Sequence, residues 1–179
     1  MNAVPGNLTP STQLTGFATY QELGHSCQDN SAVRNEPNVE DWRIRALEQF
    51  PELENEINEN TLGPEGLWID LFDALASAYE ERPVNDDLIG RIYDYAAWCF
   101  KQPDTDNVEI DLSSATAVGL IENLPLHRNV SDDLYRWLSV ESFEGFEALF
   151  RYHLSDEEYR KFHCDFIRKK SEYAGPSRL

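Results

Sequence analysis

The chain has 179 residues, and its 33 Asp and Glu residues against 15 Lys and Arg residues give a formal net charge of −18 at pH 7. Hydrophobic residues make up 41% and aromatic residues 12% of the chain, which is enough for a folded core and too much for a disordered polyanion. The negative charge argues against binding to nucleic acid or to an anionic membrane surface, because both need clustered Lys and Arg.

Residues 1–37 are rich in Asn, Ser, Thr, Gln, Gly and Pro and show no sustained helical or strand period. We therefore expect a poorly ordered N-terminal tail. The tail lacks the basic start and apolar run of a signal peptide, and the longest apolar run of the chain, residues 95–100, is far too short to span a bilayer. Three widely spaced cysteines form no disulfide framework, so the sequence predicts a cytoplasmic protein.

From residue 38 onward the apolar residues recur with helical spacing. The first helical stretch is expected to break or kink at Pro51. Pro64 suits the first turn of the next helix, which should end before Pro83. Asn85 can then cap a third helix that reaches about residue 100.

The C-terminal half continues the helical pattern. Its expected boundaries are a helix from Val108 or Leu112 to Leu124 before Pro125, a cap at Ser131, a start at Ser139 or Val140 for a helix to about His153, and a capping box at Ser155 and Glu158. No alternating pattern of β-branched residues competes with these helices. We predict that residues 38–179 form a single all-α domain, a compact bundle of six to eight helices. Short, weakly similar segments that begin at Val39, Val84 and Val130 recur at a spacing of 45–46 residues. This repeat leaves irregular, solenoid-like stacking of paired helices as an alternative.

Spacing motifs for metals, phosphates and nucleophiles are missing from the sequence. There is no CxxC, HExxH, GxSxG or phosphate-binding glycine loop. We therefore predict no catalytic, cofactor-binding or metal site. Cys99 is expected in the core, and Cys164 is expected to be a buried or half-buried structural thiol.

The charge is uneven along the chain, because residues 36–133 carry a net charge of −17 and residues 134–179 are neutral. This asymmetry predicts an acidic side of the molecule. The candidate partner-binding residues are two acidic pairs and four basic or aromatic residues: Asp86, Asp87, Asp132, Asp133, Arg136, Trp137, Tyr152 and His153. Structural alternatives stay open for the aspartates as helix-start charges, for Trp137 as a core residue and for His153 as a hydrogen-bonded packing residue.

Several short segments carry a family resemblance: YAAWC at 95–99, TAV at 116–118, ENLP at 122–125, LYRWLS at 134–139 and FRYHLS at 150–155. In that order they resemble a family of small, uncharacterised bacterial all-helical domains, a domain of unknown function. The resemblance covers roughly residues 45–167. It implies an all-helical fold, and it implies no activity and no catalytic residues.

Three classes of function follow from these patterns. The first is a protein–protein interaction module that binds a basic protein, with an immunity- or inhibitor-like protein bound to a basic toxin as its sharpest version. Solubility alone would explain the acidic charge equally well. The second is an enzyme without a recognised motif, with a pocket near His153. The third is a structural or oligomerisation domain, which keeps a homo-oligomer open.

Overall fold

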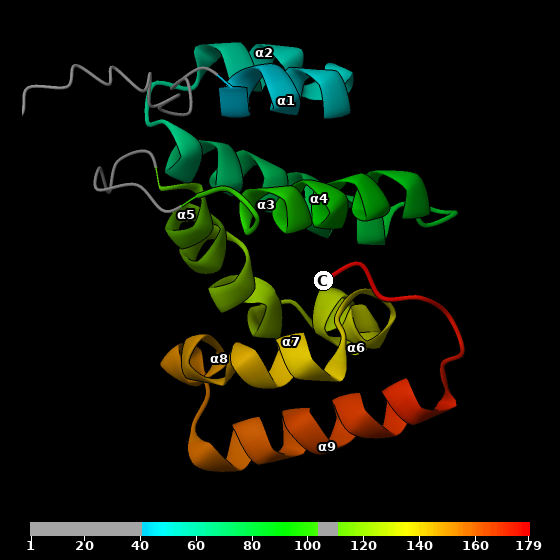
Figure 1. Cartoon of the computed structure of the whole chain (residues 1–179). Coiled ribbons are helices and arrows are strands. Elements are labelled where there is room, and N and C mark those ends of the chain that lie inside the picture. The colour runs from blue at the N-terminus through cyan, green and yellow to red at the C-terminus, as the bar shows by residue number, and fades with distance from the viewer. Residues whose placement is uncertain (1–40, 104–110) are drawn as a thin grey trace, which may run out of the picture. The chain divides into compact units, whose positions relative to one another are not determined.

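Every regular element in residues 41–103 and 111–179, the part of the chain that the structure describes, is a helix, so the predicted all-α class is confirmed. The structure is a computed structural model (Figure 1). The predicted tail, residues 1–37, lies outside the described residues. The elements in chain order are α1 (Asp41–Gln49), the 3₁₀-helix η1 (Pro51–Leu53), α2 (Glu54–Glu59), α3 (Pro64–Glu80), α4 (Asp86–Cys99), α5 (Leu112–Gly119), the 3₁₀-helix η3 (Ile121–Leu126), α6 (Arg128–Trp137), α7 (Val140–Gly145), α8 (Glu147–His153) and α9 (Asp156–Glu172).

Helix starts that carry a local chemical signal lie where the sequence predicts them. The side chain of Asn85 accepts a hydrogen bond from the backbone N–H of Leu88 at 3.2 Å and so caps α4. Ser155 and Glu158 form the predicted capping box of α9. Pro64 occupies the first turn of α3, where its missing N–H has no cost. These predictions are confirmed because each depends on residues within one turn of the helix start.

Two boundaries differ from the prediction. The helix expected to run to Leu124 ends at Gly119, and the next residues form η3 instead. Pro125 lies inside η3, where a continued α-helix would place its ring against the carbonyl of residue 121 and would have no N–H to donate to it. Ser131 is not a cap, since α6 already begins at Arg128 and the Ser131 hydroxyl donates to the Arg128 carbonyl within the helix. The start of α6 has no side-chain cap, so the sequence carries no signal for it.

Further breaks divide helices that the periodicity alone joins. The expected helix over 140–153 separates into α7 and α8 at Phe146, directly after Gly145, which is a weak helix former. The predicted break at Pro51 separates α1 from α2. The described residues therefore form nine α-helices, whereas the sequence predicted six to eight.

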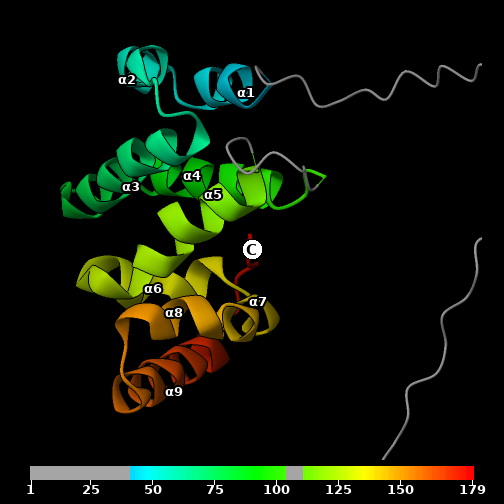
Figure 2. The same cartoon turned by 90° about the vertical axis from the view of Figure 1, so that its left-hand side faces the viewer.

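The helices are stacked in chain order. Figures 1 and 2 show α1 and α2 at one end, followed by α3 and α4, with α5 and η3 leading to α6, α7 and α8, and with α9 at the other end. Helix α3 packs against α4, α5 and α6, and α9 packs against α6 and α8. The pair α3 and α6 therefore joins the earlier helices directly to the later ones.

One continuous cluster of buried apolar side chains, from Trp42 to Phe166, runs through these layers. In its first part the ring of Tyr95 lies 5.6 Å from the ring of Phe50, and the Tyr95 hydroxyl donates to the Trp42 carbonyl at 3.0 Å. In its last part Phe143 of α7 stacks on Phe166 of α9 with 3.9 Å between ring centres. Aromatic pairs of this kind add to the stabilisation that burial provides.

The two cysteines in the described part of the chain have different surroundings. Cys99 is buried, as expected, and burial raises the pKa of its thiol to about 12. Cys164 is exposed, so the expectation of a buried or half-buried thiol is wrong. Helix α9 packs through Phe162 and Phe166, and a residue two positions from each lies about 200° around the helix from them.

Gly119 marks a close approach of α5 to α3. A Cβ placed on Gly119 would lie 2.4 Å from Cβ of Trp68, a residue that is 1% exposed. We expect Gly119→Ala to lower the free energy of unfolding by about 1–3 kcal/mol, because overpacking forces buried groups apart. Urea denaturation measures the change. Gly145→Ala in α7 is the matched control, since no atom of the described residues lies within 4 Å of its added Cβ, and no loss is expected. An equal loss in both variants would contradict the packing argument.

Candidate functional site

Four of the predicted partner-binding residues meet in one hydrogen-bonded network between α3, α4 and α6. Arg136 donates to Asp86 at 2.9 Å and to Asp133 at 3.0 Å. The same Asp133 oxygen accepts hydrogen bonds from the Tyr79 hydroxyl at 3.1 Å and from the Trp137 indole at 3.3 Å. The Trp137 indole also donates to the Tyr79 hydroxyl at 2.9 Å. The network therefore links α6 to both α3 and α4.

Most of this network is enclosed by the protein. Trp137 is 5% exposed, and Tyr93 stacks on it with 5.1 Å between ring centres. Burial raises the pKa of Asp133, against the hydrogen bonds that favour its charged form. Burial also disfavours the charged form of Arg136, but the two carboxylates outweigh it, so the pKa of the guanidinium is raised. Trp137 thus belongs to the core, which is the structural alternative that the sequence left open.

The remaining two predicted aspartates are exposed, and each already has a basic partner. Asp87 pairs with Arg91 one turn later in α4 at 2.9 Å. Asp132 pairs with Lys169 of α9 at 2.9 Å, and that hydrogen bond lowers the pKa of the Asp132 carboxyl. All four predicted aspartates are therefore compensated by Lys or Arg of the same chain. They do not form a free acidic face.

Tyr152 and His153 lie at the end of α8, where Nε2 of His153 is 3.2 Å from Oε1 of Glu122 in η3. Tyr152 is 75% exposed and meets the His153 ring edge-on, with 5.0 Å between ring centres. A carboxylate beside His153 is one of the two features that the enzyme hypothesis requires. The other is a cavity into which His153 faces.

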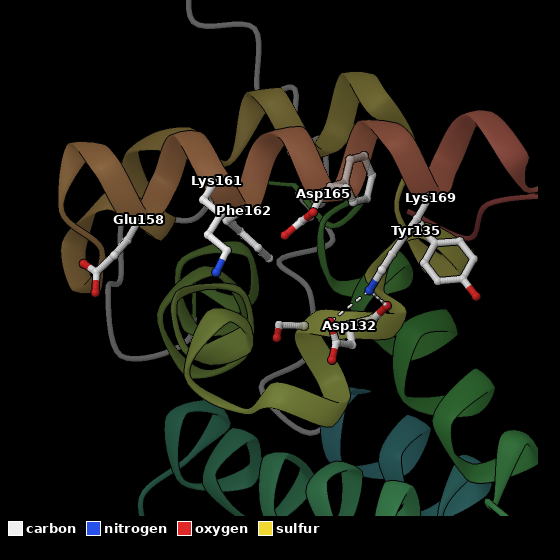
Figure 3. Close-up of a pocket in the computed structure, with 9 residues that line it drawn as sticks. Asp132, Tyr135, Glu158, Lys161, Phe162, Asp165 and Lys169 are labelled. Carbon is white, nitrogen blue, oxygen red and sulfur yellow. Dashed lines mark hydrogen bonds and ion pairs between the residues drawn. The ribbon is translucent and has the colours of Figure 1, made fainter.

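Cavities adjoin α9. One of about 200 Å³ lies between α6 and α9, and Figure 3 shows Lys161 and Lys169 projecting from α9 toward α6, where Lys169 meets Asp132. A second, of about 380 Å³, shares Lys169 and Asp132 and extends to the end of α9. A third, of about 360 Å³, has Cys164 in its wall. His153 lines none of these three cavities.

Uncompensated negative charge gathers on α2 and α3, which the predicted site did not include. Between residues 46 and 81 the sequence has ten Asp and Glu residues and no Lys or Arg. Glu48 pairs with Arg45, and Glu52 pairs with Arg91. The other eight carboxylates have no Lys or Arg of the described residues within 4.0 Å. The long stretch without a basic residue is the sequence signal that could have identified this surface.

The carboxylate of Asp70 is held close to other negative charges in this region. Burial raises the pKa of Asp70, and the charges of Glu56 on α2 and Asp73 on α3 raise it further. Two large apolar side chains of the same region are exposed, Leu62 by 72% and Ile69 by 58%. We call the following residues the acidic face of α2 and α3: Glu54, Glu56, Glu59, Leu62, Glu65, Ile69, Asp70 and Asp73.

The chain matches no protein-family model, no curated protein sequence and no solved structure. The family resemblance over roughly residues 45–167 therefore stays a prediction. Among the side chains that the structure describes, no three His, Cys, Asp or Glu residues are grouped so that they could hold a metal ion. None of the helices in residues 41–103 and 111–179 has both the length and the apolar composition that a bilayer span requires.

Replacing Trp137 by Phe keeps an aromatic ring against Tyr93 but removes the indole N–H from the network. We expect Trp137→Phe to lower the free energy of unfolding by about 2 kcal/mol at pH 7, because buried acceptors lose their donor and ring volume is lost. Chemical denaturation measures the loss. Trp98→Phe is the matched control, since Trp98 stacks on Tyr95 but its indole N–H has no acceptor among the described residues. Equal losses would mean that ring volume alone matters.

The raised pKa of Asp70 means that the folded protein binds a proton at this carboxyl more tightly than the unfolded chain does. The free energy of unfolding therefore falls as the pH rises above the ordinary Asp pKa of about 3.9. At pH 7 and low salt we expect Asp70→Asn to stabilise the protein by about 0.5 kcal/mol, a value that allows for solvent screening. At a pH of about 3.5 we expect no gain.

Thermal or urea denaturation at the two pH values tests this expectation. Asp87→Asn is the control, because Asp87 pairs with Arg91 in the first turn of α4 and its neutralisation should slightly destabilise the protein. A loss of stability in Asp70→Asn at pH 7 would contradict the repulsion inferred for this region.

Proposed function

We propose that this protein is a protein–protein interaction module whose acidic face of α2 and α3 binds a basic partner protein. The observation that carries the proposal is that the six carboxylates of this face, like Glu80 and Glu81 after them, have no Lys or Arg partner among the described residues. Elsewhere in the described part of the chain about half of the carboxylates pair with a Lys or Arg, as Asp86, Asp132 and Glu147 do, against two of the ten between residues 46 and 81. The contrast supports a surface on which the positive charge is supplied by another molecule.

The energetics of Asp70 favour the same conclusion. Burial of Asp70, together with the charges of Glu56 and Asp73 near it, raises the free energy of the folded state at neutral pH, as the raised pKa of Asp70 indicates. A surface feature that lowers stability and has no internal partner is typical of a functional site. Lys and Arg residues of a partner would relieve the repulsion and would also speed the encounter of the two proteins.

The exposed side chains of Leu62 and Ile69 give this surface an apolar component. Protein interfaces combine apolar contacts with a polar, solvated rim. A surface that serves solubility alone needs the charges but gains nothing from exposed Leu and Ile side chains. The combination therefore favours partner binding over solubility as the use of the acidic face.

The partner class that fits best is a protein whose working surface is cationic, such as a protein that acts on nucleic acid. Covering such a surface with carboxylates would block its access to phosphate groups. An immunity- or inhibitor-like role toward a basic protein is accordingly the sharpest form of the proposal.

A pulldown from lysate of the native source, with an N-terminal tag and washes at low and then high salt, tests the proposal. Two triple variants with equal charge change are compared with the wild-type chain. The test variant is Glu56→Gln, Asp70→Asn and Asp73→Asn, and the control is Glu141→Gln, Glu157→Gln and Glu172→Gln. We expect one basic protein that binds stoichiometrically, is released by salt, and binds the test variant roughly tenfold or more weakly.

The control triple should bind the same protein as tightly as the wild-type chain does. Equal capture by the test variant would contradict the use of the acidic face. If no protein is captured, solubility becomes the better account of the charge. If the chain captures only its own copies, the oligomerisation hypothesis takes the place of the proposal.

A further inference from the structure

The segment that follows α9 binds back onto the protein. Figure 1 shows its trace turning away from the end of α9 and running back to a point between α4 and α6. The backbone N–H groups of Arg178 and Leu179 donate to the Trp137 carbonyl at 2.8 and 3.0 Å. The N–H of Ser139 donates in turn to the Leu179 carbonyl at 2.7 Å. The junction of α6 and α7 thus holds the backbone of this segment.

The side chain of Arg178 occupies a site built from α4 and the Trp137 ring. Its guanidinium forms an ion pair with Asp94 and donates to the Gly90 carbonyl at 3.3 Å. Its Cζ lies 5.6 Å from the centre of the Trp137 ring, which is within cation–π distance. A carboxylate, a carbonyl and an aromatic face together suit a planar, multiply donating guanidinium.

Gly90 gives this site its shape. A Cβ on Gly90 would lie 3.2 Å from a guanidinium nitrogen of Arg178, so a larger side chain would fill the space that the guanidinium uses. A glycine inside a helix costs about 1 kcal/mol relative to alanine. The space that it leaves for Arg178 is a physical reason for a glycine at this position. Lysine at position 178 could pair with Asp94 but could not reproduce the planar, multiple contacts.

We propose that this notch, formed by Gly90, Asp94 and Trp137, is a recognition site for an arginine-bearing segment of a partner protein, and that Arg178 is an internal ligand which such a segment displaces. The internal segment is held mainly by polar contacts, which include a hydrogen bond of 2.6 Å from the Lys170 ammonium group to the Ser177 hydroxyl. Within residues 174–179 the apolar side chain that packs against the core is Leu179. The side chains of Arg178 and Asp94 are 42% and 46% exposed. A segment with few buried apolar contacts opens at low free energy.

The inference does not rest on the proposed function, because the notch and the acidic face of α2 and α3 are built from different residues. An arginine-bearing partner is nevertheless the kind that a chain of net charge −18 attracts. A tethered ligand competes at an effective concentration in the millimolar range. The apparent affinity for a partner is therefore reduced by the fraction of molecules in which the notch is open. The internal segment would act as a filter against weak arginine-containing ligands.

A labelled peptide, Gly-Pro-Ser-Arg-Leu, is the probe for this site, and fluorescence anisotropy measures its binding. The full-length double variant Arg178→Gly, Leu179→Gly removes the side chain that enters the notch and the side chain that packs against the core, and keeps the contact of Ser177 with Lys170. We expect this variant to bind the peptide roughly tenfold or more tightly than the wild-type chain does. A peptide with Lys in place of Arg should bind roughly tenfold more weakly, and so should the probe when Asp94→Asn is added to the variant.

Hydrogen exchange of the Ser139 amide reports occupancy of the site independently, because this N–H donates to Leu179 in the wild-type chain. We expect faster exchange in the double variant, and renewed protection when the peptide is added. The single variant Asp94→Asn, which keeps the internal segment, should also exchange faster than the wild-type chain. Circular dichroism confirms that the variants are folded.

Equal peptide binding by the wild-type chain and the double variant would overturn the proposal. So would an absence of binding to a folded double variant whose Ser139 amide exchanges fast, or equal binding of the Lys peptide. A wild-type dimer that forms by exchange of residues 177–179 would replace the foreign partner with a second copy and would overturn the proposal in its present form.

Discussion

The contact of Trp137 with α3 and α4 is the interaction on which the rest of this structure depends. Because the helices are stacked in chain order, each helix contacts mainly the helices next to it in the stack. Among the later helices, α6 packs against α3. Trp137 meets Tyr79 of α3 through a hydrogen bond and Tyr93 of α4 through ring stacking. Its carbonyl also holds the segment at Arg178. One side chain and its backbone thus orient the later helices and the returning segment together.

This contact is polar as well as aromatic, and burial of its polar groups costs folding free energy. The hydroxyl of Tyr93 is buried without a hydrogen-bond partner among the described residues, and burial disfavours the charged form of Asp133 and raises its pKa. An all-apolar contact would avoid both penalties. The network gives directionality instead, because Arg136 can meet Asp86 and Asp133 at once only when α4 and α6 have this relative position. We infer that it selects the arrangement of the helices more than it adds to stability.

Charged residues have different roles in the earlier and later helices. Two basic residues of the later part of the chain hold elements together: Lys169 links α9 to α6, and Arg178 links the returning segment to α4. The carboxylates of α2 and α3 have no such partners within the described residues. Both the acidic face of α2 and α3 and the notch at Gly90 are suited to positive groups. In the notch at Gly90, the positive group that binds is the chain's own Arg178.

The sequence by itself determined the all-α class and the helix starts at Pro64, Asn85 and Ser155, because caps and helix-start prolines act within one turn. The uncapped start of α6 and the exposed position of Cys164 could not be predicted in this way, since packing of the whole helix decides them. The roles of the predicted site residues were decided by the tertiary structure alone. In the sequence Asp132 and Asp133 are equivalent neighbours, yet Asp133 turns to Tyr79 and Asp132 to Lys169, which lie 54 and 37 residues away. Where the partner is this distant in the sequence, a carboxylate becomes structural or free according to the charges that folding brings within a few ångströms of it, and no local pattern encodes that distance.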